Sequence, residues 1–258
     1  MQTATRIAVV VPIRFVPRPQ AAADAPDTHC STCHLKDLCL PEGLAAPDVR
    51  RLDTLMFARR RVKEGQPLYH EGESFQYLYA VRSGTLKSVM GSRDGRDQVT
   101  AFHMAGELMG LDGLAEGKHA SCSVALEDAE VCAIPHAQLS ALSATSAELL
   151  QLVSRLMSRE IVRERSLMML LGGMSADERL AAFLLNISKR MHARGYSATE
   201  FHLRMSRADM GSYLGMTLET VSRTFSGFQQ RGLLQVDKKH VRILDLAGLR
   251  QAFEANLQ

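Results

Sequence analysis

The chain contains 258 residues, of which 46% are hydrophobic and 23% are charged. This is the balance of an ordinary soluble globular protein, and the length exceeds that of a typical single domain. No apolar run approaches the roughly 20 residues of a membrane-spanning helix, so we expect no membrane partner, and a net charge of +3 decides nothing about nucleic acid.

Residues 1–28 are typical of a loose tail, because they hold four of the eight prolines and an alanine-rich stretch. Their apolar run Ile7–Val11 is too short for the core of a secretion signal, and no cleavage site accompanies it. We therefore expect a cytoplasmic protein.

Residues 29–44 form a cysteine segment with the spacing C-x2-C-x5-C, and two more cysteines follow far along the chain. The five are Cys30, Cys33, Cys39, Cys122 and Cys132. An odd, clustered set does not suit a disulfide framework in a reducing compartment. Three close cysteines and one distant one are a common iron–sulfur arrangement. From spacing alone, zinc with help from His29 or His34, and redox thiols, stay open.

Residues 45–145 contain short β-type runs separated by glycine-containing turns. The clearest runs are Gln76–Val81, Leu86–Met90 and Val99–His103. Turns at intervals of about 8–12 residues between alternating runs are typical of antiparallel rolls and sandwiches.

Residues 146–171 contain no glycine or proline, and their apolar residues recur at three- and four-residue spacing. This pattern predicts one long helix, which Gly172-Gly173 would end. The residues of its apolar stripe are Leu149, Val153, Met157, Ile161, Met168 and Leu171. Glu164 falls on the same stripe.

The remainder, 172–258, has the pattern of helices followed by a short hairpin, and it contains a helix-turn-helix spacing. Ser206 and Thr217 are each placed to cap a helix through their hydroxyl groups. Between them, Gly215 suits a turn with positive φ, and Gly211 allows the two helices to approach closely. Val221 then points the second helix inward.

The second of these helices carries a face suited to DNA bases. If Thr217 is its cap, Glu219, Ser222 and Arg223 lie together near its N-terminus, the part that enters the major groove. Arginine pairs with guanine, glutamate accepts from cytosine, and serine is adaptable. The alternative is an i, i+4 surface ion pair between Glu219 and Arg223, but the caps and glycines favour DNA binding.

Further residues of this region are predicted to position the DNA backbone. The candidate phosphate contacts are Arg207, Thr217 and Thr220. Leu233–Val236 and His240–Leu244 flank a basic tip and form the predicted wing.

Together these features resemble the CRP/FNR regulators, specifically the branch of the fumarate and nitrate reduction regulators. The likeness covers about Cys30 to Ile243. It is most specific in the cysteine segment, in Leu156–Glu160 with Glu178–Phe183, and in Glu219-Thr-Val-Ser-Arg223. The resemblance implies an α+β fold: a cyclic-nucleotide-binding-type β-roll, a long dimerisation helix and a C-terminal winged helix-turn-helix.

The resemblance also implies a [4Fe–4S] cluster and its ligands. The family's fourth ligand lies in a Val-Cys-x-Ile-Pro context, which here is Val131–Pro135. Cys132 therefore joins Cys30, Cys33 and Cys39 as ligand, and Cys122 becomes a packed small residue.

In nucleotide-binding relatives, an arginine after a Gly-Glu loop holds the cyclic phosphate. The loop is present here as Gly106–Gly110, but Lys118–Val124 offers no arginine. A buried anion without such a partner is costly, so we expect no cyclic nucleotide.

The implied assembly is a homodimer in which the stripe of the long helix meets its copy across a two-fold axis. The predicted interface residues are Val153, Met157, Ile161, Glu164 and Met168. Two facing glutamates repel each other or lose water, so the dimer is marginal by itself. A small rotation that leaves Glu164 at the edge of the seam is the alternative.

In the implied cycle, an intact cluster packs the cysteine segment against the long helix and favours the dimer, whereas oxygen converts the cluster and returns monomers. The dimer binds double-stranded DNA at a TTGAT-N4-ATCAA-like palindrome. The loop Ser92–Asp97 and the region around Arg194 match family surfaces that contact RNA polymerase.

Three other functions compete with this interpretation. One is a CRP-like regulator gated by a small molecule in the β-roll, and another is a constitutive zinc-stapled DNA-binding protein. The third is an iron–sulfur enzyme or electron carrier, but no substrate-binding glycine loop or catalytic triad is apparent in the sequence, so we expect no enzyme.

Overall fold

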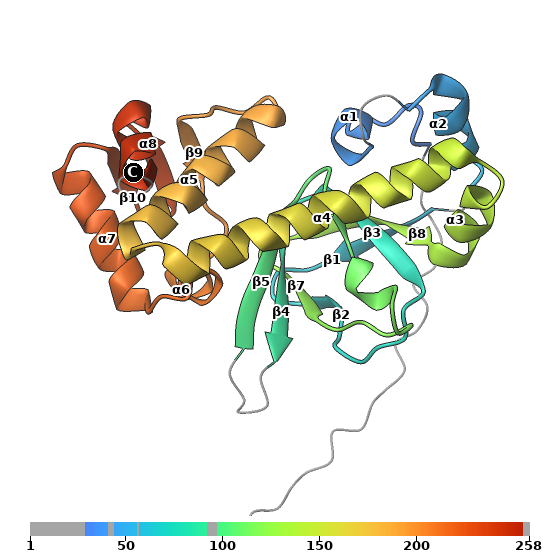
Figure 1. Cartoon of the computed structure of the whole chain (residues 1–258), viewed down its shortest axis with the longest axis horizontal. Helices are drawn as coiled ribbons and strands as arrows, with labels where there is room; N and C mark the ends of the chain where they lie inside the picture. Colours follow the sequence, from blue (N-terminus) through green and yellow to red (C-terminus); the bar gives the residue numbers. More distant parts are fainter. Residues whose placement is uncertain (1–28, 41–43, 56, 92–96, 255–258) are drawn as a thin grey trace, which may run out of the picture.

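The computed structural model describes residues 29–40, 44–55, 57–91 and 97–254, so the predicted tail 1–28 lies outside the described residues. One long helix, α4 (Ala147–Gly173), runs along the molecule (Figure 1). A β-roll lies beside its N-terminal half, and a second, mainly helical unit lies at its C-terminal end (Figure 1). The predicted α+β fold is confirmed.

The roll consists of two four-stranded antiparallel sheets, with strand orders β1-β8-β3-β6 and β2-β7-β4-β5. The strands are β1 (Ala58–Val62), β2 (Pro67–Tyr69), β3 (Tyr77–Ser83), β4 (Thr85–Gly91), β5 (Asp97–Met104), β6 (Leu108–Met109), β7 (Cys122–Ala125) and β8 (Ala129–Pro135). Alternate residues such as Val81, Leu86 and Val131 are fully buried between the sheets. The predicted runs fall on β3, β4 and β5.

The cysteine segment and three short helical elements cover one end of the roll. They are α1 (Lys36–Cys39), α2 (Ala46–Leu52) and α3 (His136–Ser143). Leu52 of α2 and Leu139 of α3 pack with Leu149 and Leu152 of α4 in one apolar cluster. This cluster anchors the N-terminal end of the long helix to its own roll.

Helix α4 begins and ends for local reasons. Ser146 precedes it, and its Oγ accepts a hydrogen bond from the Leu149 N–H at 3.3 Å. The helix continues through both glycines to Gly173, two residues beyond the predicted end at Leu171, and Met174 then turns extended. Ser175 starts the next helix with a capping box, which explains why the chain changes direction there.

The C-terminal unit, which we call the DNA-binding unit after the function that the resemblance implies, contains four helices and a three-stranded sheet. Its elements are α5 (Ala176–Ala193), β9 (Glu200–His202), α6 (Arg207–Leu214), α7 (Leu218–Gln230), β10 (Leu234–Asp237), β11 (His240–Ile243) and α8 (Leu246–Glu254). The sheet order is β10-β11-β9. The sequence patterns predicted the β10–β11 hairpin as a wing but missed β9, a strand of three residues with little pattern of its own.

The residues of the helix-turn-helix spacing have the predicted structural roles. Ser206 and Thr217 cap α6 and α7 through their side chains, and Gly215 between them has φ of +61°. A Cβ at Gly211 would lie 2.6 Å from the Met216 carbonyl oxygen, so only glycine allows this close approach. Val221 is fully buried.

The roll and the DNA-binding unit share an apolar core. The Phe102 ring of β5 lies 6.1 Å from the Phe183 ring of α5 and 5.1 Å from the Tyr213 ring of α6, measured between ring centroids. Val99 of β5 belongs to the same cluster. The two parts are therefore packed against each other and not merely joined by α4. No helix among the described residues combines the length and apolar character that crossing a bilayer requires.

The close approach at Gly211 predicts a specific loss of stability. Gly211→Ala forces a methyl group against a backbone carbonyl that cannot rotate away, so we expect a loss of about 1–3 kcal/mol in the free energy of unfolding. Gly227 on α7 is the matched control, because a Cβ there would meet nothing within 4 Å. Gly227→Ala should stabilise by roughly 0.5–1 kcal/mol. Urea unfolding measures both, and equal changes would contradict the packing.

Candidate functional site

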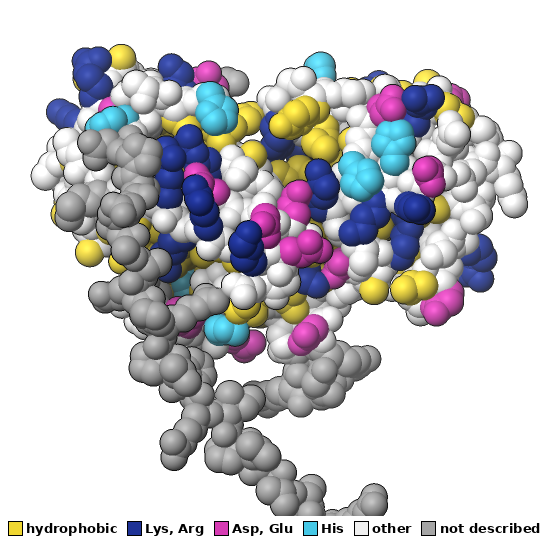
Figure 2. Space-filling model, turned by 180° about the vertical axis from the view of Figure 1, so that it is seen from behind, with side chains coloured by type: hydrophobic (Ala, Val, Ile, Leu, Met, Phe, Trp, Pro, Cys, Tyr) yellow, Lys and Arg dark blue, Asp and Glu magenta, His cyan; other side chains and the backbone are white. Residues whose placement is uncertain are grey.

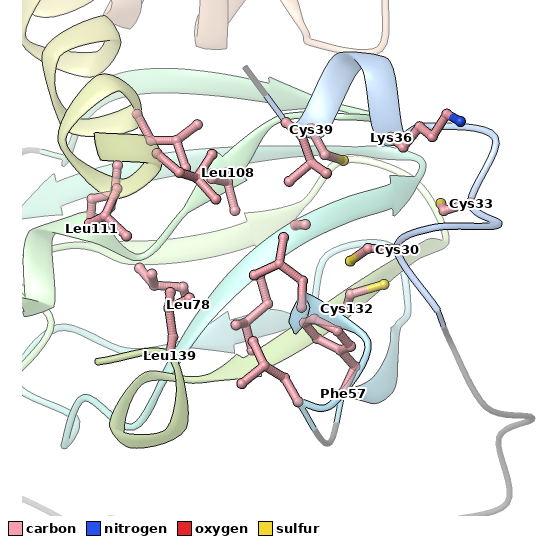
Figure 3. A pocket seen from close by; sticks show the side chains of 18 residues that line it. Cys30, Cys33, Lys36, Cys39, Phe57, Leu78, Leu108, Leu111, Cys132 and Leu139 are labelled. Atoms are coloured by element: carbon pink, nitrogen blue, oxygen red, sulfur yellow. The ribbon is translucent and has the colours of Figure 1, made fainter. Parts of the chain in front are cut away.

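Four of the five cysteines line one cavity (Figure 3). Cys30 and Cys33 come from the loop before α1, Cys39 from the end of α1, and Cys132 from the middle of β8. The fifth lies on β7, in the other sheet of the roll. The structure thus brings together the four predicted ligands from two segments that are far apart in sequence.

The walls of this cavity are otherwise almost entirely apolar, and they include the long helix. The α4 side chains in the wall are Leu152, Val153 and Leu156. Phe57 and Leu78 contribute from the roll. The cavity that the cysteines line therefore extends to the N-terminal half of α4.

The cysteine loop is tied to its surroundings by polar contacts. The Ser31 N–H donates to the Asp53 carboxylate at 3.0 Å, which joins the loop to the end of α2. Arg82 of β3 lies beside the Cys33 sulfur at 4.0 Å and forms an ion pair of 3.1 Å with Glu130. A cationic side chain thus lies next to the sulfur atoms.

Burial dominates the acid–base chemistry of these thiols. It raises the pKa of Cys30 and of Cys39 to about 12, and the neighbouring cysteines add to the effect. Burial also raises the pKa of Cys132, while Arg82 opposes the change. The thiols of Cys30, Cys39 and Cys132 are therefore protonated at neutral pH unless a metal replaces their protons.

The donor set fits an iron–sulfur group. Thiolates are soft ligands that select zinc, copper(I) or iron–sulfur clusters. Among the described residues, no three Cys, His, Asp or Glu side chains are grouped closely enough to hold one metal ion. In a four-iron cluster each thiolate binds a different iron atom, so four thiols spread around one cavity suit a cluster.

A second side of α4 carries an exposed apolar stripe and borders another cavity, which residues of the roll such as Ser88 and His103 also line. Met157, Ile161 and Met168 have exposed fractions of 42%, 47% and 71%. Glu164, also exposed, lies between them, and the four positions follow one another at spacings of four, three and four residues. This spacing is that of a coiled-coil seam. Val153, which was predicted at the same interface, lines the cysteine cavity, and its place at the interface stays a prediction.

The predicted base-reading face of α7 is open. Glu219 and Arg223 are exposed and Ser222 is half-buried. No ion pair joins Glu219 to Arg223 in the described part of the chain. Thr217 and Thr220 face each other at 3.0 Å between hydroxyl oxygens, at the helix N-terminus where the helix dipole favours an anion.

Arg207 is less accessible than its sequence position suggests. Its guanidinium lies 3.4 Å from the centroid of the Phe225 ring, and burial lowers its pKa to about 10, so it stays cationic at neutral pH. Its predicted phosphate contact remains a prediction. At the wing tip, Lys238 has φ of +53°, and the Lys239 ammonium donates to the Arg204 carbonyl at 3.0 Å.

Arg194 is largely buried, although the sequence predicted a surface position for it. Its side chain is only 8% exposed and forms an ion pair of 2.5 Å with Glu107 of the roll. In the loop Ser92–Asp97, residues 92–96 lie outside the described residues. The sequence analysis did not find the Glu107 cluster, because its partners follow 56 to 87 residues later and no local pattern connects them.

Comparisons with known proteins agree with this architecture. The family model of the cyclic nucleotide-binding domain matches residues 59–146, and that of the Crp-like helix-turn-helix domain matches residues 178–252. The first match coincides with the roll and the second with the DNA-binding unit.

The similarity extends to whole proteins. The chain is 48% identical over 228 residues to the transcriptional regulatory protein btr of Bordetella pertussis, which covers 88% of this chain and 94% of that protein. It is 43% identical to the anaerobic regulatory protein of Haemophilus influenzae, with 86% of each covered. The structure of FixK2 from Bradyrhizobium japonicum superposes with a TM-score of 0.72 at 29% identity, covering 77% of this chain and 98% of that one.

Proposed function

This chain belongs to the CRP/FNR family of transcription regulators, and we propose that it is an oxygen-responsive member that binds DNA as a homodimer while a [4Fe–4S] cluster is intact. The family consists of DNA-binding regulators and not of enzymes. The printed name of the Haemophilus influenzae relative, an anaerobic regulatory protein, supports a response to oxygen.

The observation that carries this proposal is the cavity shared by the four cysteines and α4. Cys30, Cys33, Cys39 and Cys132 line one part of the cavity, and Leu152 and Leu156 of α4 line another. A change in how the cysteine segment packs would therefore directly alter the contacts of α4 with this cavity.

Four thiolates would hold the cluster, which supplies the group that reacts with oxygen. The chain provides the rest. The apolar walls around the cysteines limit the access of water, and Arg82 places a positive charge beside thiolates that bear negative charge when they bind metal. Coordination would also hold α1 and the preceding loop against β8.

The exposed seam of α4 is the proposed dimer interface. Met157, Ile161 and Met168 would meet their copies in a second protomer, with Glu164 facing its own copy or lying beside it. Because a buried pair of like charges opposes association, the dimer depends on further stabilisation. We infer that an ordered cysteine segment supplies it by fixing the N-terminal half of the helix.

The dimer would place two α7 helices about 34 Å apart, one turn of DNA. Glu219, Ser222 and Arg223 would read a TTGAT-N4-ATCAA-like half-site, and the hydroxyls of Thr217 and Thr220 would contact phosphate. RNA polymerase is a further proposed partner. Since Arg194 is turned inward, the neighbouring Tyr196, 64% exposed, is a side chain available for such a contact.

A nucleotide-gated regulator is the main competing function, and one feature of the roll disfavours it. The carboxylate of Asp112 accepts from the backbone N–H groups of Ala120 and Ser121 at 3.0 and 2.9 Å. These amides belong to the segment where nucleotide-binding relatives hold the phosphate. An anion of the chain itself thus already uses these donors.

Anaerobic purification tests the proposal. We expect a brown protein that contains about four iron atoms per chain, bleaches in air, and shifts from dimer to monomer as it does so. A colourless, zinc-loaded dimer that is stable in air would overturn it and favour the zinc-stapled alternative.

The two cysteines of the roll give a matched pair of variants. Cys132→Ser removes a proposed ligand and should abolish cluster incorporation, measured by iron content and visible absorption after anaerobic reconstitution. Cys122→Ser changes a half-buried thiol outside the cavity and should retain the wild-type values. Equal iron content in both variants would contradict the assignment of Cys132.

Glu164 should control self-association. Glu164→Ala removes a charge from the apolar seam, so we expect the dimer of the air-exposed protein to tighten by about tenfold, equivalent to roughly 1.4 kcal/mol. Sedimentation velocity over a range of concentrations measures this change. Arg165→Ala, one residue further along the helix but off the seam, is the control; the same tightening there would indicate a general effect of shortening a long side chain on this helix.

Arg223 should contribute to sequence discrimination. Arg223→Ala is expected to cost about 1–3 kcal/mol on the cognate operator and to relax the preference at one guanine. Binding titrations against the operator and single-base variants show the pattern. Arg250→Ala on α8 controls for the loss of one positive charge, and a uniform loss across unrelated DNA would place Arg223 on phosphate instead.

A further inference from the structure

We propose that the Gly106–Glu107 turn of the roll is the element that positions the DNA-binding unit, and that it links this unit to the cysteine segment within one protomer. The link to the cysteines rests on the function proposed above. The positioning role of Glu107 stands on the geometry alone.

The first observation is a buried ion cluster between the roll and the DNA-binding unit. The Glu107 side chain is 13% exposed and receives hydrogen bonds from Arg190 of α5 at 2.9 and 2.6 Å and from Arg194 at 2.5 Å. Arg163 of α4 lies 3.4 Å from the same carboxylate. One carboxylate thus contacts α4 and two arginines of the DNA-binding unit.

The arginines are bound to the roll by more than this carboxylate. Arg190 also donates to the Phe102 carbonyl at 2.7 Å, and Arg194 donates to the Ala105 carbonyl at 2.7 Å. Burial alone would raise the pKa of Glu107, but the three guanidinium groups hold it at about 2, so the carboxylate is charged at neutral pH. Because buried charge-assisted hydrogen bonds have strict geometry, the cluster specifies one orientation of the unit.

The second observation is that the edge of the roll continues the same interface to the helix-turn-helix. Strand β5 is an edge strand, so its outward N–H groups need partners. The Val99 N–H donates to the Ser212 hydroxyl of α6 at 2.8 Å. Lys87 of β4 pairs with Asp209 at 2.5 Å, the residue that completes the capping box of α6. The helix-turn-helix is therefore packed against the roll.

The third observation connects the turn to the cysteine segment. Gly106 has φ of +85°, and any Cβ there would collide with the side chain of Leu38 on α1. Leu38 directly precedes the proposed ligand Cys39. Helix α1 thus rests directly on the turn that holds the DNA-binding unit.

The docked orientation leaves the base-reading face free. Glu219, Arg223 and Leu218 at the start of α7 are exposed, away from the roll. Seen from the side opposite to Figure 1, acidic and basic side chains lie close to one another across the middle of the molecule (Figure 2). An orientation that is fixed and unobstructed reduces the ordering cost of binding DNA, so the ion cluster should favour binding.

Glu107→Gln tests the positioning role. We expect operator affinity of the anaerobic protein to fall by about tenfold, and hydrogen exchange to accelerate at the Val99 amide, which reports docking directly. The control is Glu127→Gln, which removes an exposed ion pair of 3.2 Å to Arg204 across the same interface. It should change affinity by less than about threefold. Unchanged affinity and exchange in Glu107→Gln, or tighter DNA binding, would overturn the proposal.

A double-mutant cycle separates positioning from a general loss of stability. Arg190→Gln alone should resemble Glu107→Gln, and the double variant should be no worse than either single variant, because both remove the same interaction. Additive losses would show that the two residues act independently. If circular dichroism shows that Glu107→Gln does not fold, the rate of hydrogen exchange at the Val99 amide in Arg190→Gln tests the positioning role instead.

Leu38→Ala tests the link to the cysteines. It keeps all four thiols, so iron content should match the wild type, while exchange at Val99 and operator affinity should shift toward the Glu107→Gln values. Asp37→Asn, on the exposed side of the same short helix, should leave all three measurements unchanged. Wild-type exchange and affinity in Leu38→Ala would remove the link.

These results are independent of the proposed oxygen response. If the wild-type protein binds its operator equally in air and under argon, the proposed function fails, while exchange in Glu107→Gln still decides the positioning role. If oxygen controls DNA binding by the wild-type protein, but Glu107→Gln and Leu38→Ala have wild-type operator affinity and hydrogen exchange, only the inference about the Gly106–Glu107 turn fails.

Discussion

The division of α4 into two faces is the constraint on which the rest of the structure depends. One face is buried against the roll of the same chain, with Leu149 and Leu152 fully or almost fully buried. The other face leaves Met168 and its apolar neighbours largely exposed beside a second cavity, which the roll also lines. A helix presents an apolar stripe to only one partner surface at a time, so a helix with two apolar faces implies a second surface that covers the exposed one. The cavity of the cysteines lies on the first face and the seam on the second.

The sequence predicted this helix well but merged its two faces, and helical geometry explains why. Leu149, Val153, Met157 and Ile161 follow one another at steps of four residues, which looks like a single stripe. Each such step advances about 40° around the helix, so Leu149 and Ile161 point in directions about 120° apart. Val153 therefore lies in the cavity wall, and its role at the dimer interface stays a prediction. A spacing of four and three residues, as from Met157 to Met168, follows one face more closely.

Local sequence patterns led to correct predictions of caps and turns. Caps and turns depend on neighbouring residues, so Ser206, Thr217 and Gly215 were each predicted correctly from their immediate surroundings. The cysteine spacing alone left several metals open, and Cys132 was chosen through a family resemblance. The Glu107 cluster was not predictable in this way, because ion pairs across a domain interface are set by tertiary packing. Only the structure shows that the Gly-Glu loop contacts arginines of the DNA-binding unit.

Two physical requirements for binding a palindrome are thus assigned to different parts of the same chain. In the proposed function, the seam of α4 determines whether two DNA-binding units are present, and the Gly106–Glu107 turn determines how each is oriented. Helix α1 is adjacent to both, since Cys39 lines the cavity against α4 while Leu38 rests on Gly106. A rearrangement of α1 would weaken dimer association and loosen the orientation of the DNA-binding unit at the same time. Because the two free energies act on the same bound state, a modest change in each multiplies in the affinity for DNA.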